Sequence, residues 1–128
     1  MVDVDEVAQS MDVAVVDAPE LRDDVNAMYV DAERMILLRP GLDPWTRRSC
    51  LAHELAHAYF RDEISEPRIE RRADQWAAQL LISPVEYAAA ETIVGSSVGA
   101  LAYELDVTPA VIETWRECFR LRCHTPTI

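Results

Sequence analysis

Lysine is absent from this sequence of 128 residues, and glycine and cysteine each occur only three times. All twelve basic residues are therefore arginine, a bias that we attribute to a GC-rich genome rather than to chemistry. So few cysteines exclude a disulfide framework and suit a reducing compartment. No apolar run reaches the roughly 18 residues of a membrane span, and the N-terminus is acidic where a signal peptide would be basic. We expect a cytoplasmic protein that makes no membrane contact.

Positive charge is also scarce, because 23 acidic residues face 12 basic ones and leave a net charge of −11. Residues 1–33 alone hold ten acidic residues and one arginine, Arg22. Such a chain is poorly suited to nucleic acid, whose phosphates need clustered positive charge. It is better suited to a basic protein partner, although solubility alone also accounts for the charge. We expect no direct binding of nucleic acid.

The length fits one domain, and we assign residues 1–128 to a single domain. β-Branched and apolar runs, two of them separated by a turn at 31–33, predict strands at 13–16, 25–30 and 34–38. A short helix is expected at 2–10. Capping residues and prolines predict the later helices, at 43–60, 67–82, 83–95, 96–105 and 108–121. This order predicts an α+β fold, with a small N-terminal antiparallel sheet followed by a helical bundle.

Residues 96–121 have the pattern of a helix-turn-helix, in which the second helix opens at Thr108 and Pro109. That second helix carries Glu113 and Glu117, and few of its residues are suited to reading bases. We therefore expect this pair of helices to pack within the domain rather than to bind DNA.

Two of the three histidines lie in the segment 53–57, which reads His-Glu-Leu-Ala-His and is an H-E-x-x-H motif in the first long helix. Residues four apart lie one turn apart on the same helix face, so His53 and His57 are placed to hold one zinc ion. Glu54 lies about 100° round the helix, from where it can take a proton from water activated by the metal. The flanking residues are apolar and predict a buried helix that shields the site: Leu51, Ala52, Leu55, Ala56 and Ala58.

A catalytic zinc site needs a third protein ligand and one open position. The extended motif H-E-x-x-H-x-x-G-x-x-H is excluded, because Phe60 and Glu63 stand where it requires glycine and histidine. In the next helix Glu70 and Asp74 are four residues apart and share a face. Glu70 can bind the metal, and Asp74 can accept the ring N–H of a histidine ligand. Glu63 and Glu66, in the preceding loop, remain rival third ligands.

These residues resemble the motifs of the ImmA/IrrE family of zinc peptidases. In that family a helix with H-E-x-x-H precedes a helix of the form E-x-x-A-[ND]-x-F-A-x-x-L-L-x-P. The matching residues here are Glu70, Ala73, Asp74, Trp76, Ala77, Leu80, Leu81 and Pro84. Trp76 replaces the usual phenylalanine, an extra Ser83 precedes the proline, and Arg72 stands where relatives often carry glutamate. The resemblance covers roughly residues 10–120.

The resemblance implies a thermolysin-like site with one zinc ion per chain, held by His53, His57 and Glu70, and Glu54 as the catalytic base. It also implies an endopeptidase whose protein substrate is a helix-turn-helix repressor, a basic DNA-binding protein encoded nearby in a phage or mobile element. We expect this substrate to lie along the edge of the small sheet by strand addition.

Three alternatives stay open at this point. The donor that stabilises the oxyanion is one of Tyr59, Tyr87 and Tyr103, or none of them. Cys50 lies three residues before His53 on the same helix face; packing in the core explains it most simply, and a role as a fourth metal ligand is the alternative. The protein as a whole can also be a non-catalytic regulator, in which the zinc fold sequesters a repressor or belongs to a toxin–antitoxin pair.

Overall fold

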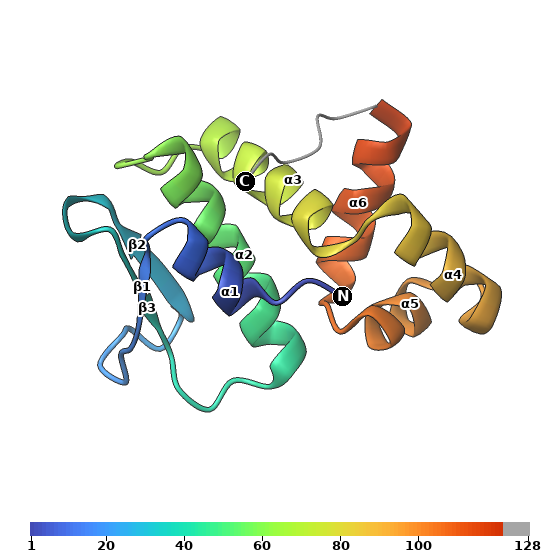
Figure 1. Cartoon of the computed structure of the whole chain (residues 1–128), viewed down its shortest axis with the longest axis horizontal. Helices are drawn as coiled ribbons and strands as arrows, with labels where there is room; N and C mark the ends of the chain where they lie inside the picture. Colours follow the sequence, from blue (N-terminus) through green and yellow to red (C-terminus); the bar gives the residue numbers. More distant parts are fainter. Residues whose placement is uncertain (122–128) are drawn as a thin grey trace.

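The structure, a computed structural model, describes residues 1–121 and consists of a small sheet followed by helices (Figure 1). The N-terminal elements are α1 (Val4–Ser10), β1 (Ala14–Asp17), β2 (Ala27–Val30), the 3₁₀ helix η1 (Asp31–Glu33) and β3 (Met35–Leu38). The later elements are α2 (Pro44–Phe60), α3 (Pro67–Leu81), α4 (Pro84–Val94), α5 (Val98–Leu105) and α6 (Pro109–Leu121). The expected α+β class is confirmed. None of the helices in residues 1–121 is long and apolar enough to cross a membrane.

The sheet has the strand order β1-β3-β2, and its pairing is mixed. β2 and β3 pair antiparallel across the turn at η1, as expected, but β1 pairs with β3 in parallel. The expectation of a wholly antiparallel sheet is therefore wrong for β1. The cause lies in β3, whose Ile36 and Leu38 side chains are 0% and 1% exposed. A strand this apolar is most stable in the centre of the sheet. The long connection formed by residues 18–26 allows β1 and β2 to lie on opposite sides of β3.

Helix α2 lies at the centre of the molecule, between the sheet and α3 (Figure 1). The Asp43 carboxylate caps it by accepting a hydrogen bond from the Thr46 N–H at 2.8 Å, and Pro44 fills the first helical position. Its fully buried side chains are small or aliphatic: Leu51, Ala52, Leu55, Ala56 and Ala58. The alanines leave room for α3 to approach closely. The two helices that carry the candidate ligands are therefore packed directly against each other.

Helices α4, α5 and α6 pack beyond α3, and the local signals in the sequence explain where they begin. Ser83 and Glu86 form the expected capping box at the start of α4, with both hydrogen bonds present. α5 begins two residues later than expected because Ser97 is its cap, accepting a hydrogen bond from the Ala100 N–H. The buried indole N–H of Trp115 donates to the Ile82 carbonyl at 2.8 Å and fixes α6 to the end of α3.

Candidate metal centre and active site

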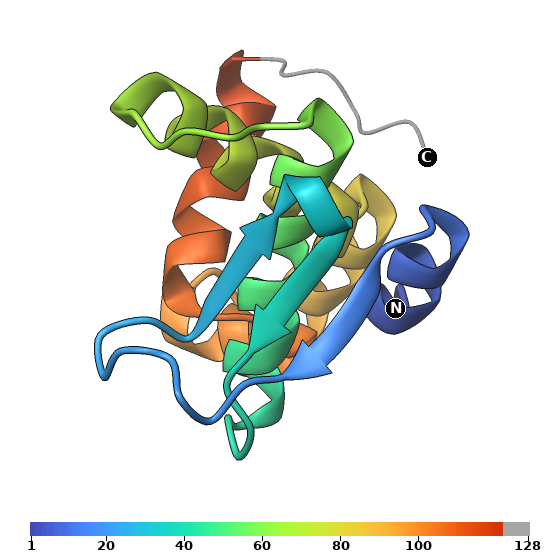
Figure 2. The same cartoon turned by 90° about the vertical axis from the view of Figure 1, so that its left-hand side faces the viewer.

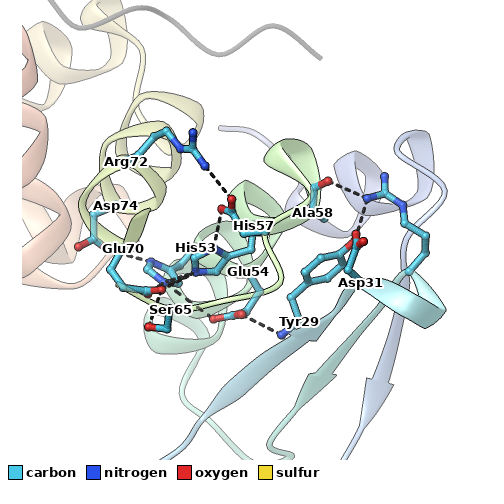
Figure 3. Close-up of polar contacts among 12 residues, drawn as sticks. Tyr29, Asp31, His53, Glu54, His57, Ala58, Ser65, Glu70, Arg72 and Asp74 are labelled. Atoms are coloured by element: carbon cyan, nitrogen blue, oxygen red, sulfur yellow. Dashed lines mark hydrogen bonds and ion pairs between the residues drawn. The ribbon is translucent and has the colours of Figure 1, made fainter. Parts of the chain in front are cut away.

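The two motif histidines and Glu70 converge at one point between α2 and α3 (Figure 3). The Nε2 atoms of His53 and His57 are 3.2 Å apart, as their positions one turn apart in α2 require. The Glu70 carboxylate from α3 lies 2.9 Å from the His53 Nε2 and 3.3 Å from the His57 Nε2. Glu63 and Glu66 are exposed and do not join this group within residues 1–121. The structure thus brings together the set that the resemblance implied.

The donor chemistry of this group fits a cation. Each histidine turns its Nδ1 toward an aspartate carboxylate, which only accepts hydrogen bonds, so the proton of the neutral ring belongs on Nδ1. Both Nε2 atoms then carry lone pairs that face each other and the Glu70 oxygen. A tetrahedral zinc ion, with bonds of about 2.0–2.1 Å, requires ligand atoms about 3.3–3.4 Å apart, close to the spacing found here. Two imidazoles and one carboxylate are a known donor set of catalytic zinc.

Asp74, which the sequence offered as a supporting residue, bonds to the first histidine. Its Oδ1 lies 2.8 Å from the His53 Nδ1. Asp74 is one turn after Glu70 on α3, so a single helix face supplies a candidate ligand oxygen and the carboxylate that orients the His53 ring. A hydrogen bond of this kind fixes the tautomer of the ring and increases the basicity of its metal-binding nitrogen.

Asp62 plays the same part for the second histidine, and the sequence did not reveal it. Its Oδ2 lies 3.0 Å from the His57 Nδ1, and its side chain is 8% exposed. The turn that ends α2 places it there: Arg61 is left-handed, its N–H bonds to the Ala58 carbonyl, and the Asp62 N–H bonds to the His57 carbonyl at 2.9 Å. Glycine is the usual residue at the left-handed position of such a turn. Because arginine stands there instead, the sequence carries no signal for this turn.

Arg72, the departure from the family pattern, is the partner of Asp62. Its guanidinium lies 2.7 Å from the free oxygen of Asp62 and packs over the Phe60 ring at 3.9 Å from the ring centroid. Arg72 thereby joins α3 to the end of α2 beside His57 (Figure 3). A glutamate at position 72 would instead repel Asp62, so the arginine suits the carboxylate that this chain uses.

Glu54 lies beside the convergent ligands rather than among them. One carboxylate oxygen accepts a hydrogen bond from the Tyr29 N–H of β2 at 2.9 Å, and the other lies 4.0 Å from the His53 Nε2. Burial raises the pKa of Glu54 despite the nearby histidines and the Tyr29 N–H, which favour its charged form. A carboxyl whose pKa is raised toward neutrality is suited to taking up and returning a proton.

The pKa values of His53 and Glu70 shift in opposite directions. Burial lowers the pKa of His53, but the hydrogen bond to Asp74 and the charge of Glu54 outweigh burial and raise it to about 9. Burial raises the pKa of Glu70, but its hydrogen bonds to His53 and to the Ser65 hydroxyl, together with the charge of His57, lower it overall. Without a cation, a proton on the His53 Nε2 therefore satisfies the Glu70 carboxylate.

Comparison with known proteins agrees with this geometry. The model of the family described as Peptidase_M78, the IrrE N-terminal-like domain, matches residues 8–113. This chain belongs to that family. The resemblance drawn from the two helix motifs is thereby confirmed.

A similar solved structure is described as a Mycobacterium tuberculosis transcriptional regulator. It superposes with a TM-score of 0.65 at 16% sequence identity, a likeness that concerns the fold alone. The match covers 87% of this chain and 39% of the other, so this chain spans well under half of that protein. No curated protein sequence matches this chain.

A cleft with a volume of about 450 Å³ opens next to His53 and Glu54. Its walls come from the β2 edge, from α2 and α3, and from the start of α6, and its apolar lining is Val25, Ala27, Cys50, Ala77, Ala110 and Val111. Cys50 therefore faces this cleft instead of the interior of the core. The helical pair near the C-terminus contributes part of the wall through α6, a role that the sequence did not indicate.

None of the three candidate tyrosines lines this cleft within the described part of the chain. Tyr59 is exposed and packs against Trp76, Tyr87 accepts a hydrogen bond from Arg116, and Tyr103 is exposed on α5. The oxyanion role proposed for one of them therefore gains no support from their positions.

A second polar network attaches the β2–β3 hairpin to the end of α2 (Figure 3). The Arg34 guanidinium donates to the Tyr29 hydroxyl at 2.9 Å, to the Ala58 carbonyl at 2.7 Å and to the Met11 carbonyl at 3.1 Å. It thus links the helix that carries both histidines to the strand whose Tyr29 N–H holds Glu54.

Proposed function

We propose that this chain is a zinc-dependent endopeptidase that cleaves a protein substrate. One zinc ion is held by His53, His57 and Glu70, and Glu54 is the general base. The observation that carries the proposal is the convergence of three lone-pair atoms, each 2.9–3.3 Å from the next, beside a separate buried carboxylate. A purely structural cluster has no need of that second carboxylate.

The bound metal, the base and the two supporting aspartates have separate roles in the proposed reaction. Bound zinc lowers the pKa of water toward about 7 and polarises the scissile carbonyl. Glu54 takes a proton from the attacking water and returns it to the leaving nitrogen, a task suited to its raised pKa. Asp74 and Asp62 hold the two imidazole rings in the orientation in which Nε2 faces the site.

The free edge of β2 supports an extended substrate. Among residues 1–121, β2 pairs on one side only, with β3, and its outer edge faces Glu54 through the Tyr29 N–H. A peptide that adds to this edge as a further strand enters the cleft that Val25, Ala27 and Glu54 line. We infer that such a segment places its scissile bond at the metal.

The substrate class that fits best is a helix-turn-helix repressor in the cytoplasm. Its basic surface complements the net charge of −11, and the ImmA/IrrE motifs of this chain carry the same implication. The decisive assay mixes the zinc-loaded chain with the repressor encoded beside its gene and identifies products by mass spectrometry. One defined cut is expected with the wild type and no cut with Glu54→Gln at equal zinc content. Equal cutting by Glu54→Gln rules out the assigned base.

A second function is a non-catalytic regulator, favoured by the description of the similar Mycobacterium tuberculosis structure as a transcriptional regulator. Release of the repressor from its operator with no cut product, and to the same extent by Glu54→Gln, indicates this function instead. A gel-shift assay read beside the mass spectrum separates the two.

A further inference from the structure

The three strands have two faces of different character. Along each strand alternate side chains point to opposite sides. The inner face carries Val15, Tyr29 and Ile36, which pack against the hydrophobic core beside α2. The outer face carries six residues, none of them in that core: Ala14, Val16, Met28, Val30, Met35 and Leu37.

All six outer residues are apolar, and the strand register joins them into two rows. Val16 pairs with Leu37, and Leu37 pairs with Met28, so these three side chains form one row across the sheet. The second row contains Ala14, Met35 and Val30. A sheet with one face in water normally alternates apolar and polar residues. The absence of any polar residue here shows that this face is not built for water alone.

No helix within residues 1–121 lies over this face (Figure 2), and within it Val30, Met35 and Leu37 are half-buried. Figure 2 shows the sheet in front, with the helices behind it. Val16 and Met28 are 39% and 44% exposed. Contiguous apolar surface of this kind marks interaction sites in soluble proteins.

The surroundings of the outer face are negative. Four carboxylates in the adjoining loops and turns are exposed and form no ion pair within residues 1–121: Asp12, Glu20, Asp23 and Glu33. The three arginines of the same region are already engaged. Arg22 pairs with Asp24, Arg34 binds the end of α2, and Arg39 donates to the carbonyls of Leu21, Arg22 and Val25.

We infer that the outer face of the sheet is a docking surface for a basic protein, which inserts aliphatic side chains between arginines or lysines. Charge decides between this partner and a second copy of the chain. A symmetric dimer through this face brings two sets of unpaired carboxylates together, whereas a basic partner neutralises them. The inference does not depend on peptidase activity, because none of the six residues belongs to the metal centre.

The strand β2 connects the outer face of the sheet to the cleft. β2 contributes Met28 and Val30 to the docking surface and, through Tyr29, holds Glu54 at its free edge. A protein bound on the outer face therefore lies next to the strand edge that leads to the cleft.

The test uses the full chain carrying Glu54→Gln, so that no probe is cut. The probe is a fluorescein-labelled amphipathic peptide with leucine on one face and arginine on the other. Its binding is measured by fluorescence anisotropy. A matched peptide has glutamate in place of arginine. The surface variant is Val16→Thr with Met28→Thr, since threonine is well tolerated in strands. The control is Val85→Gln with Ile93→Gln on α4, two side chains that are 78% and 70% exposed.

The arginine peptide is expected to bind and the glutamate peptide not to bind. The surface variant should weaken binding by at least about tenfold, and the control should change it by less than about twofold. Circular dichroism verifies that both variants are folded. Independently, replacing Glu20, Asp23 and Glu33 by their amides should weaken binding and flatten its salt dependence, unlike the same change at Glu91, Glu104 and Glu113.

Three results overturn the inference. The first is that the arginine peptide does not bind. The second is that the α4 control loses as much affinity as the surface variant. The third is that sedimentation shows a dimer that Val16→Thr with Met28→Thr abolishes, which assigns the face to a second copy of the chain.

Discussion

Replacement of Asp62 by alanine is expected to weaken zinc binding while the protein stays folded. Asp62 bonds to the His57 Nδ1 at 3.0 Å and is the only side chain with a hydrogen bond to that nitrogen within residues 1–121. Loss of such a partner typically costs about 10–100-fold in metal affinity, or about 1.4–2.7 kcal/mol. Arg72, the other partner of Asp62, has a side chain that is 46% exposed and can return to water, so its loss adds little.

The assay is a competition titration against a fluorescent zinc chelator, with three variants beside the wild type. Asp62→Asn keeps a carbonyl oxygen that can accept the His57 N–H but loses the charge, so its affinity should fall between those of the wild type and Asp62→Ala. Glu63→Ala is the matched control, because Glu63 is the next residue, is exposed, and forms no ion pair within residues 1–121. It should bind zinc as the wild type does.

Two results would refute this reasoning. The first is an Asp62→Ala affinity within about twofold of the wild type, which is less than the loss of an outer-shell partner predicts. The second is an equal loss in Glu63→Ala, which would point to a general effect of the loop. Thermal unfolding of the metal-free proteins, compared across the variants, separates weakened zinc binding from a damaged fold.

The remaining predictions concern pH and stability. The pKa of His53 rises from 6.5 to about 9 in the metal-free fold, so its protonated form stabilises the folded state. This stabilisation is complete below about pH 6.5 and is lost as the pH rises through about 9. The free energy of unfolding should fall by up to about 3 kcal/mol over that range. Urea unfolding of the metal-free protein should show this fall, and His53→Asn should not. Zinc must displace that proton and also lowers the pKa of its bound water toward about 7, so at pH 7.5 calorimetry in two buffers should show more than about one proton released per zinc bound. Ser83→Ala removes the cap of α4 and should cost about 1 kcal/mol in urea unfolding, whereas Thr92→Ala, exposed within α4, should cost less. Trp115→Phe removes the buried hydrogen bond to the Ile82 carbonyl and should cost about 1–2 kcal/mol in the same assay.

The helices were predictable because their signals are local. Asp43 with Pro44, and Ser83 with Glu86, mark helix starts within four residues of sequence, and the structure begins α2 and α4 there. The pairing of β1 with β3 was not predictable in the same way. It depends on which of three short strands is most deeply buried, and this follows from packing against α2 rather than from any local pattern.

In the candidate site, too, some residues could be predicted from local spacing and others could not. His53 and His57, and likewise Glu70 and Asp74, are four residues apart, so periodicity places each pair on one helix face. That Glu70 joins the histidines was implied by the resemblance to the family, since the spacing left Glu63 and Glu66 as rivals. Asp62 could not be grouped with the candidate ligands, because its position follows from a left-handed turn for which glycine is the usual signal.

The cleft beside the candidate metal centre could likewise not be predicted from the sequence. Part of its wall comes from α6, far along the sequence from the H-E-x-x-H motif. The candidate ligands were therefore visible in the sequence and the family motif, whereas Asp62 and the walls of the cleft depended on the fold.

The central claim is that His53, His57 and Glu70 hold a metal ion. Its most direct test is metal analysis by inductively coupled plasma mass spectrometry after purification without chelators, on the wild type, Glu70→Ala and Glu63→Ala. One zinc per chain is expected in the wild type and in Glu63→Ala, and loss of most of it in Glu70→Ala. A wild type without metal, or a Glu70→Ala variant that keeps its full zinc content, would contradict this claim.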